Sequence, residues 1–200
     1  RVYELDGQGQ VFLGNQSVPE AGTFGIFTDN TATNNQLNTG QDSDIYVWNQ
    51  NSVTNGTTTA FEGDNVITWR YTSSNEWFGG GINAKKSIDL SNFNDSGALS
   101  FSINIPADVS FKVGIADTYS NQHWVEFPAN TTKYGLIRNG DWATAIIPAA
   151  DIRGDLVALQ SLEGMFYIAS VDGDLPSTPF DMAIDDIVWT GGGEVKITDT

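Results

Sequence analysis

Ala98-Leu-Ser-Phe-Ser-Ile-Asn-Ile105 alternates apolar and polar side chains residue by residue. This period of two is the one at which the side chains of a β-strand point to opposite faces of a sheet. Similar short runs, bounded by Gly, Asn, Asp or Pro, recur at Thr23–Thr28, Asp44–Trp48, Asn65–Tyr71, Ser110–Ala116, Trp124–Phe127, Ala143–Ile147, Met165–Ala169 and Met182–Trp189. The sequence therefore predicts an all-β sandwich.

The segments between these runs are mostly turns and loops. Ala149–Gln160 favours a turn or one short helix, and Asn92–Ser96 a second isolated turn. Thr31–Gly40 and Asn49–Thr59 are almost wholly polar, so we expect two long surface loops at one end of the sandwich. We expect a single domain over residues 1–190, followed by a Gly-rich tail or linker to another domain at 191–200.

Composition restricts the partners of this domain. Hydrophobic residues make up 40% of the 200 residues, which suffices for a core without disulfides, and the chain has no Cys. The net charge of −16 excludes nucleic acid and anionic membranes, which need Lys and Arg to displace counterions. It favours neutral over acidic polysaccharides. No apolar stretch approaches the roughly 20 residues of a membrane span, and we expect a secreted or cell-surface, extracellular monomer.

Two tryptophans lie in polar, loop-like segments. Trp77 follows Ser-Ser-Asn-Glu and precedes Phe-Gly-Gly-Gly, while Trp124 lies in Tyr-Ser-Asn-Gln-His-Trp-Val-Glu-Phe. The C–H-rich face of a sugar ring stacks on an indole, and polar side chains take the hydroxyls at its rim. Each tryptophan is therefore a candidate for sugar stacking, the alternative being a partly buried loop anchor.

Hydrogen-bonding side chains surround both candidates. Glu76 precedes Trp77, and a set near Trp124 is formed by Asp117, Tyr119, Asn121, Gln122 and His123. Trp48 ends its predicted strand beside an Asn-rich loop and is a further candidate for ligand contact. Core packing is expected for Trp69 and Trp189, and a structural role for Trp142.

The chain offers no convincing catalytic set. His123 is its single histidine, so a Ser-His-Asp triad has no strong candidate and a zinc site has no His cluster. The β-sandwich laminarinases carry Glu-x-Asp-x-x-Glu on one strand, whereas Glu62-Gly-Asp64 has no third acid at the required position. Lyases of this architecture use Gln-Ile-His, which Gln122-His123-Trp124 does not match. We expect a non-enzymatic domain without catalytic residues.

The acids are better explained by calcium, which takes six to eight oxygen ligands. Asp29 follows an early predicted strand, and Asp185 lies within the last one. An Asp inside an apolar strand is costly unless it is paired or bound to a metal. First and last strands are often neighbours in sandwiches, so we expect a structural Ca2+ with Asp185 as the best ligand, and Asp29 and Glu62 as further candidates. The alternative is that one Asp of the Asp185-Asp186 pair simply faces solvent by alternation.

Several segments resemble a known group of domains, namely Asp-Ile-Tyr-Val-Trp (44–48), Phe-Glu-Gly-Asp-Asn-Val-Ile-Thr-Trp (61–69), Trp-Phe-Gly-Gly-Gly-Ile (77–82), Asn-Gly-Asp-Trp-Ala-Thr-Ala-Ile-Ile-Pro (139–148) and Ala-Ile-Asp-Asp-Ile-Val-Trp (183–189). They are similar to β-sandwich, galactose-binding-like carbohydrate-binding modules appended to marine laminarinases and exo-glucanases. The likeness spans roughly Phe24 to Thr190. It implies a jelly-roll of two antiparallel sheets, a structural calcium that includes Asp185, and a sugar platform.

The leading expectation is a non-catalytic module that holds a covalently linked catalytic domain on a neutral polysaccharide. A β-1,3-glucan such as laminarin is the favoured ligand, and an agar-type galactan is the second choice. Two other classes of function remain open. One is a structural or adhesion domain, which buried Trp77 and Trp124 side chains would favour. The other is a glycoside hydrolase or lyase domain, which would need two carboxylates in a cleft.

Overall fold

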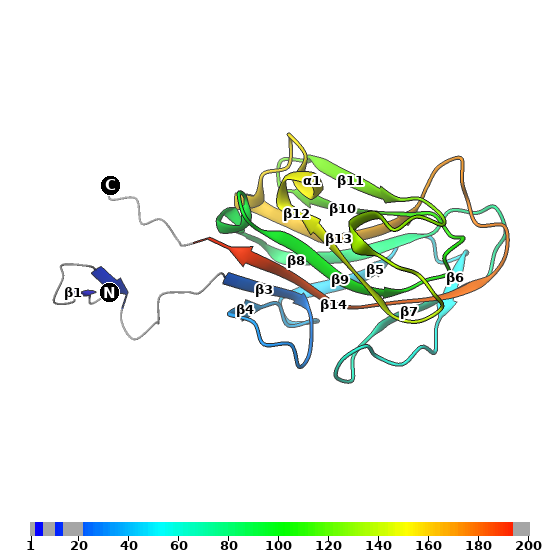
Figure 1. The fold of residues 1–200 in the computed structure, drawn as a ribbon, viewed down its shortest axis with the longest axis horizontal. Helices are drawn as coiled ribbons and strands as arrows, with labels where there is room; N and C mark the ends of the chain where they lie inside the picture. The colour runs from blue at the N-terminus through cyan, green and yellow to red at the C-terminus, as the bar shows by residue number, and fades with distance from the viewer. Residues whose placement is uncertain (1–2, 6–10, 14–21, 194–200) are drawn as a thin grey trace.

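The computed structural model describes Tyr3–Leu5, Val11–Leu13 and residues 22–193. Its body is two facing β-sheets with only short helical turns between strands (Figure 1). Two short strands, β1 (Tyr3–Leu5) and β2 (Val11–Leu13), pair with each other in antiparallel fashion. The predicted all-β sandwich is confirmed.

The first sheet has five strands, and every neighbouring pair in it is antiparallel. Across the sheet the order is β11 (Gln122–Phe127), β10 (Phe111–Asp117), β13 (Leu162–Ser170), β8 (Gly79–Ile88) and β5 (Ser43–Val47). β5 therefore forms one edge of this sheet.

The second sheet is organised around its longest strand, β14 (Phe180–Gly192). One side of β14 pairs with β9, while the other side pairs with β7 along its first half and with β3 along its second half. The early strand β3 thus lies beside the last strand, as the sequence predicts. The remaining bounds are β12 (Ala143–Pro148), β9 (Ala98–Asn104), β3 (Gly22–Phe27), β4 (Asn35–Gln36), β7 (Ile67–Tyr71) and β6 (Val53–Asn55).

Short helices connect some of the strands. The helix expected near residue 150 is α1 (Ala149–Arg153), and the turns include η1 (Ser91–Phe93), η2 (Lys133–Gly135) and η3 (Leu159–Ser161). No helix in the described ranges is long and apolar enough to cross a membrane.

Five described strands are absent from the sequence prediction, and β1 and β2 are two of them. β4 and β6 lie inside the two Asn-rich segments that we expected to be loops, and β8 begins with Gly79-Gly80-Gly81, which has no strand-like pattern. β14 continues to Gly192, so the first glycines of the predicted tail belong to the last strand. Residues 194–200 of that tail lie outside the described residues.

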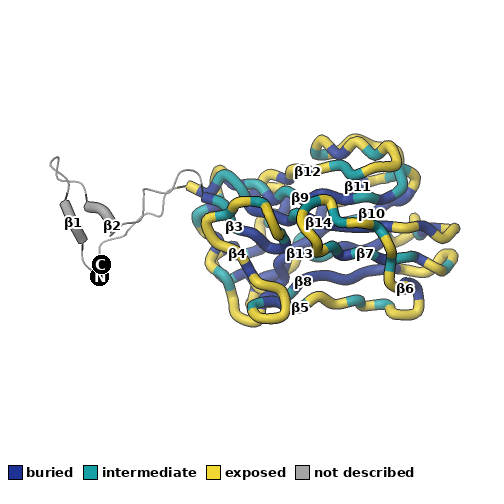
Figure 2. The backbone as a smooth tube through the Cα atoms, turned by 90° about the horizontal axis from the view of Figure 1, so that it is seen from below, coloured by how far each residue is buried: buried dark blue, intermediate teal, exposed yellow. Residues whose placement is uncertain are grey.

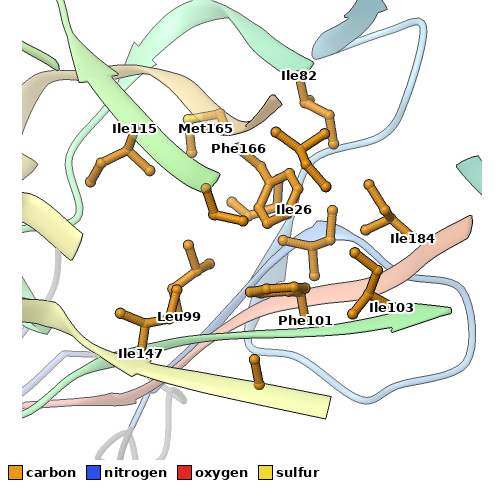
Figure 3. Close-up of a cluster of buried hydrophobic side chains, with 14 of the residues drawn as sticks. Ile26, Ile82, Leu99, Phe101, Ile103, Ile115, Ile147, Met165, Phe166 and Ile184 are labelled. Atoms are coloured by element: carbon orange, nitrogen blue, oxygen red, sulfur yellow. The ribbon is translucent and has the colours of Figure 1, made fainter. Parts of the chain in front are cut away.

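Apolar side chains from both sheets fill the space between them. Figure 3 shows Phe101 of β9 and Ile184 of β14 facing Ile82 of β8 and Phe166 of β13. Exposed residues gather in the loops around the buried strands (Figure 2). Trp69 and Trp189 are both buried in this core, as expected. A continuous core of this size lets loops and sheet faces vary without loss of the fold.

Phe101 tests the contribution of this core. Its ring is fully buried and contacts the rings of Phe127 and Phe166 at centroid distances of 5.8 and 5.2 Å. We expect Phe101→Ala to lower the free energy of unfolding by about 3–5 kcal/mol, because it removes buried surface and leaves a cavity. Urea unfolding would measure this loss. The control Ile146→Ala, at a side chain that is 55% exposed on β12, should cost under about 1 kcal/mol, and equal losses would contradict the assignment of the core.

Candidate functional site

One row of residues crosses the five-stranded sheet at right angles to its strands. Tyr46 on β5 lies opposite Gly81 on β8, and Gly81 lies opposite Tyr167 on β13. Tyr167 lies opposite Gly114 on β10, which lies opposite Trp124 on β11. Residues directly opposite each other on neighbouring strands point to the same face. The row therefore presents three aromatic side chains on one face, with a glycine between each pair.

This face is the outer face of the sheet. Residues next to the row on their strands, namely Ile82, Val113 and Ile168, are buried in the core, so alternation directs the side chains of the row away from it. Tyr46 is 46% exposed, and Trp48, two residues further along the same edge, is 40% exposed. Exposed aromatic side chains on a sheet face are a candidate binding surface.

Glycines allow the rings to lie close to the backbone of the sheet. A Cβ atom at Gly114 would lie 2.6 Å from Cδ2 of Trp124, and one at Gly79 would lie 2.8 Å from Cε3 of Trp48. A Cβ at Gly81 would collide with the ring of Tyr167. Any side chain at these positions would displace a ring, so the glycines define where the rings lie.

Trp48, Trp124 and Tyr167 form one connected cluster, which we call the aromatic platform. The ring centroids of Trp48 and Tyr167 are 5.1 Å apart with an interplanar angle of 74°, and those of Trp124 and Tyr167 are 6.0 Å apart at 34°. Trp48 and Trp124 are 6.3 Å apart at 77°. The platform is therefore not flat, because the plane of the Trp48 ring is nearly perpendicular to the planes of the other two rings.

Polar groups border the platform. The Tyr167 hydroxyl donates to Oδ1 of Asn83 at 2.7 Å, and the Trp124 indole N–H donates to Oε1 of Gln122 at 3.3 Å. The ammonium of Lys112 lies 4.8 Å from the centre of the Trp124 ring. Burial, reinforced by the charge of Glu163, raises the pKa of Tyr167, so its hydroxyl stays a donor at neutral pH. The surface thus joins apolar rings to hydrogen-bonding groups and to one ammonium group, that of Lys112.

Trp77 lies two residues before the start of β8. Its carbonyl accepts a hydrogen bond of 2.6 Å from the side-chain amide of Asn49, the residue after Trp48. Its neighbour Phe78 is buried, whereas the Trp77 side chain is 43% exposed. Glu76 lies in the same loop and is exposed, with its backbone held by the hydroxyl of Tyr71. The structure therefore brings Trp77 near the Trp48 side of the platform, outside the ring cluster itself.

The residues predicted around Trp124 are divided between different settings. Gln122 shares the platform face, whereas Tyr119 is exposed in the turn between β10 and β11. The intervening His123 points to the other side of β11, where its Nδ1 lies 3.2 Å from the carbonyl oxygen of Ile152. His123 is thus turned away from the platform.

Asp117 has a structural setting of its own. It is buried and accepts hydrogen bonds from the backbone N–H groups of Tyr119, Asn121 and Ala158, and from the Asn121 side chain. Burial raises its pKa, but these four hydrogen bonds outweigh burial and hold it below the ordinary value. Asp117 and Asn121 therefore organise the hairpin turn, with their polar groups already engaged.

The sequence reasoning did not select Tyr46, Tyr167, Asn83 or Lys112. Tyr46 could have been found, because it alternates with Ile45 in a predicted strand. Tyr167 gave no clear signal, since a β-bulge near Gly164 disturbs the alternation in β13 and leaves both Met165 and Phe166 buried. Its position became clear only from the pairing of β13 with β8 and β10.

The predicted metal ligands come together in a network of backbone hydrogen bonds. Asp185 is fully buried at a β-bulge in β14 and accepts the N–H groups of Phe61, Glu62 and Asp186. Burial raises the pKa of Asp185, and these N–H groups partly offset the rise. The carboxylate of Glu62 in turn accepts the backbone N–H groups of Asp29 and its neighbour Asn30.

Asp29, which follows β3, completes this network by binding the loop that precedes β7. It accepts the N–H groups of Asp64 and Asn65 at 2.8 and 2.7 Å and the Asn65 side chain at 2.8 Å. These bonds, led by that of the Asn65 side chain, hold the pKa of Asp29 below its ordinary value. Within the described ranges, no three His, Cys, Asp or Glu side chains are arranged to hold a metal ion. The calcium site stays a prediction.

Removing the Asp185 carboxylate tests the network. We expect Asp185→Ala to lower the free energy of unfolding by about 2–4 kcal/mol, because buried N–H groups lose their acceptor. The matched control is Asp181→Ala in the same strand, where an exposed ion pair with Arg70 is lost. The control should cost no more than about 1 kcal/mol. Similar urea midpoints for the two variants would contradict the structural role of Asp185.

Chelation tests whether calcium adds to this network. A structural calcium bound by Asp29, Glu62 and Asp185 would stabilise the fold, so we expect excess EDTA to lower the thermal midpoint, and Ca2+ but not Mg2+ to restore it. An unchanged midpoint would contradict the calcium site, because the N–H groups would then be enough to compensate these three carboxylates.

Comparisons with known proteins bear on the class of this fold. A family 30 carbohydrate-binding module is 18% identical over 84% of this chain and 98% of that chain, with a TM-score of 0.58. The family 30 module of a cellulosomal cellulase of Clostridium thermocellum is also 18% identical, covering 71% and 83% of the two chains at a TM-score of 0.53. At these identities the likeness establishes the fold.

A family 11 module from Clostridium thermocellum, in complex with a β-1,3-1,4-mixed-linked tetrasaccharide, is 12% identical. It covers 88% of this chain and 100% of that chain, with a TM-score of 0.54. Comparison with curated proteins gives no significant match. Residues 23–191, most of the chain, match the family described as Carbohydrate binding domain 30. The chain therefore belongs to this family of non-catalytic, β-sandwich carbohydrate-binding modules.

Proposed function

We propose that the aromatic platform binds a single strand of a neutral polysaccharide, with a β-glucan as the leading ligand. The observation that carries this proposal is the cluster of Trp48, Trp124 and Tyr167 on the outer face of the five-stranded sheet. Apolar faces of sugar rings stack on such aromatic rings, while Asn83 and Gln122 lie where ring hydroxyls need partners. The affinity expected of a few stacked rings is roughly millimolar to micromolar, or about −4 to −8 kcal/mol.

The ring angles favour a single soluble chain over a crystalline surface. A flat crystal face would require coplanar rings, but the Trp48 plane is inclined by 77° to that of Trp124. Because the Trp48 plane is inclined by 74° to that of Tyr167, Trp48 can instead contact the side of a sugar ring that stacks on Tyr167. We therefore infer that the ligand is a separated chain that can bend to follow the platform.

The aromatic row suggests the path of that chain. It crosses five strands from Tyr46 to Trp124, and four strand spacings of roughly 4.8 Å give a length of about 19 Å. Several consecutive sugar rings fit along such a row. The exposed Trp77 near the Trp48 side offers an additional stacking position next to it.

Two observations support β-glucan as the ligand class. The net charge of −16 disfavours acidic polysaccharides. The structurally similar family 11 module is in complex with a tetrasaccharide that contains β-1,3 and β-1,4 linkages. We keep laminarin-type β-1,3-glucan as the leading ligand, mixed-linkage β-glucan as its close relative, and agar-type galactan as the second choice.

The biological role that we infer is attachment. A non-catalytic module would hold a covalently linked catalytic domain at the polysaccharide. This attachment raises the effective concentration of the polysaccharide at the catalytic domain. Because such polymers lie outside the cell, we infer an extracellular, monomeric module. Trp77 is 43% exposed and Trp124 is half-buried, so neither is buried in the core as a purely structural or adhesion domain would require, and this favours the attachment role.

Substitution of the platform tests the proposal. We expect Trp124→Ala and Tyr167→Ala each to weaken binding of soluble β-glucan at least about tenfold, or about 1.4 kcal/mol, because each removes a stacking surface. Affinity electrophoresis in gels containing laminarin, mixed-linkage glucan, agarose or xylan would measure the loss. Isothermal titration with the retarding glycan would then give its size.

The matched control is Trp142→Ala. This indole contacts Phe61 at the second sheet, far in the strand order from the platform, so its loss should leave affinity unchanged. Unfolding midpoints would show that all variants fold. Unaltered binding by the folded Trp124 and Tyr167 variants would refute the platform, and retention by agarose alone would replace β-glucan with the galactan.

A further inference from the structure

A groove lies beside the edge strand β5, on the side of that strand away from the aromatic platform. Its volume is about 560 Å³, within the range of about 300–1,000 Å³ usual for ligand sites. Three segments meet there: the end of β3, the residues after β4 and the residues before β7. We call it the edge groove and define it by Leu37, Asn38, Thr39, Ile45, Asn65 and Val66.

The edge strand β5 separates the edge groove from the platform. Ile45 lines the groove, while the adjacent Tyr46 belongs to the aromatic row on the outer face. A smaller hollow of about 330 Å³ shares Ile45 and Val66 with the groove and extends it along the same edge. The edge groove and the aromatic platform therefore lie on either side of β5 and use different residues.

Hydrogen bonds hold both walls of the groove in place. In the first wall, the carboxylate of Asp42 accepts the N–H of Asn38 at 2.9 Å, and its carbonyl accepts the N–H of Lys85 at 2.8 Å. The Lys85 ammonium donates to the carbonyl of Gly40 at 2.6 Å. In the second wall, Asp29 holds the backbone of Asn65. The groove is thus formed before any ligand arrives, which lowers the entropic cost of binding.

The lining suits a neutral, hydroxyl-rich ligand. Leu37, Ile45 and Val66 provide an apolar floor for C–H groups. At the rim, the Asn38 amide and the Thr39 hydroxyl are exposed, and neither makes a side-chain hydrogen bond to any residue in the described ranges. An amide and a hydroxyl can each donate and accept, as sugar hydroxyls do.

Charged ligands fit the edge groove less well. Neither Lys nor Arg lines it, so an anion finds no counter-charge. The one carboxylate in the lining, that of Asp29, already accepts hydrogen bonds from Asp64 and Asn65. A cation would therefore compete with bonds that hold the wall in place.

We propose that the edge groove is a second binding site for a neutral saccharide, independent of the aromatic platform. This proposal takes its ligand class from the proposed function but uses none of the platform residues. Because no exposed aromatic ring lines the groove, the site is weaker than the platform. Two sites on one module would allow it to contact two chains, or two parts of one chain, and so increase avidity without a second domain.

The test is a titration of 15N-labelled protein with a mixed-linkage β-1,3-1,4-glucan tetrasaccharide, followed by two-dimensional NMR. The protein carries Trp124→Ala and Tyr167→Ala together, which disables the platform. At about 10 mM saccharide, above the roughly millimolar Kd of weak sites, we expect the amide signals of Asn38, Thr39 and Asn65 to shift. Adding Ile45→Lys should weaken this response at least tenfold, whereas Gln160→Ala, at an exposed position in η3, should not change it.

The same titration of the unsubstituted protein distinguishes the platform proposal from the edge-groove proposal. It also tests both proposals if the double variant fails to fold. The Trp124 indole N–H reports on the platform, and the Asn38 and Thr39 amides report on the groove. Shifts at both sites with different Kd values would support the second site. Shifts at the indole alone would overturn the edge groove and leave the platform intact. Shifts at the groove alone would overturn the platform, and an absence of shifts at both would overturn both sites for this saccharide class.

Discussion

The contact between aromatic rings and bare glycine backbone determines the outer face of the five-stranded sheet. At Gly79, Gly81 and Gly114 a Cβ atom would occupy space that the rings of Trp48, Tyr167 and Trp124 now fill. The rings therefore rest against a rigid surface rather than on flexible loops. This close packing limits their rotation and leaves little conformational entropy to be lost when a ligand stacks on them.

A second constraint lies in the opposite sheet, at the bulge in β14. There β14 changes its partner from β7 to β3, and the buried carboxylate of Asp185 accepts N–H groups from the loop that precedes β7. Through Glu62 and Asp29 the same hydrogen bonds extend to the end of β3. One buried acid at an irregular point of the ladder thus positions a loop that also forms a wall of the edge groove.

Strand β5 lies between the aromatic platform and the edge groove. Its alternation directs Tyr46 to the outer face and Ile45 to the groove. Most edge strands are protected by charge or by a covering loop, because an open edge invites association. Here the edge is bordered on both sides by the two surfaces that we propose as saccharide sites, and the net charge of −16 opposes association between copies.

The sequence alone determined the class of the protein. All nine strands predicted from period-two alternation are present in the structure. The alternation arises because one face of each strand is buried and the other is not. Composition disfavoured acidic polymers as partners. The polar surroundings of Trp77 and Trp124, together with five segments that resemble known modules, indicated a carbohydrate-binding module. These properties depend on local pattern and on sums over the chain, and neither requires knowledge of which strands are neighbours.

Only the tertiary structure decided which residues form the site. Trp48, Trp124 and Tyr167 are far apart in sequence and meet because β5, β8, β13, β10 and β11 pair in one register. The same register turned His123 away from Trp124. Glycine has no side chain to give a strand signal, so β8, which separates β5 from β13, was absent from the prediction. A site built across strands depends on non-local pairing, and local sequence patterns do not encode that pairing.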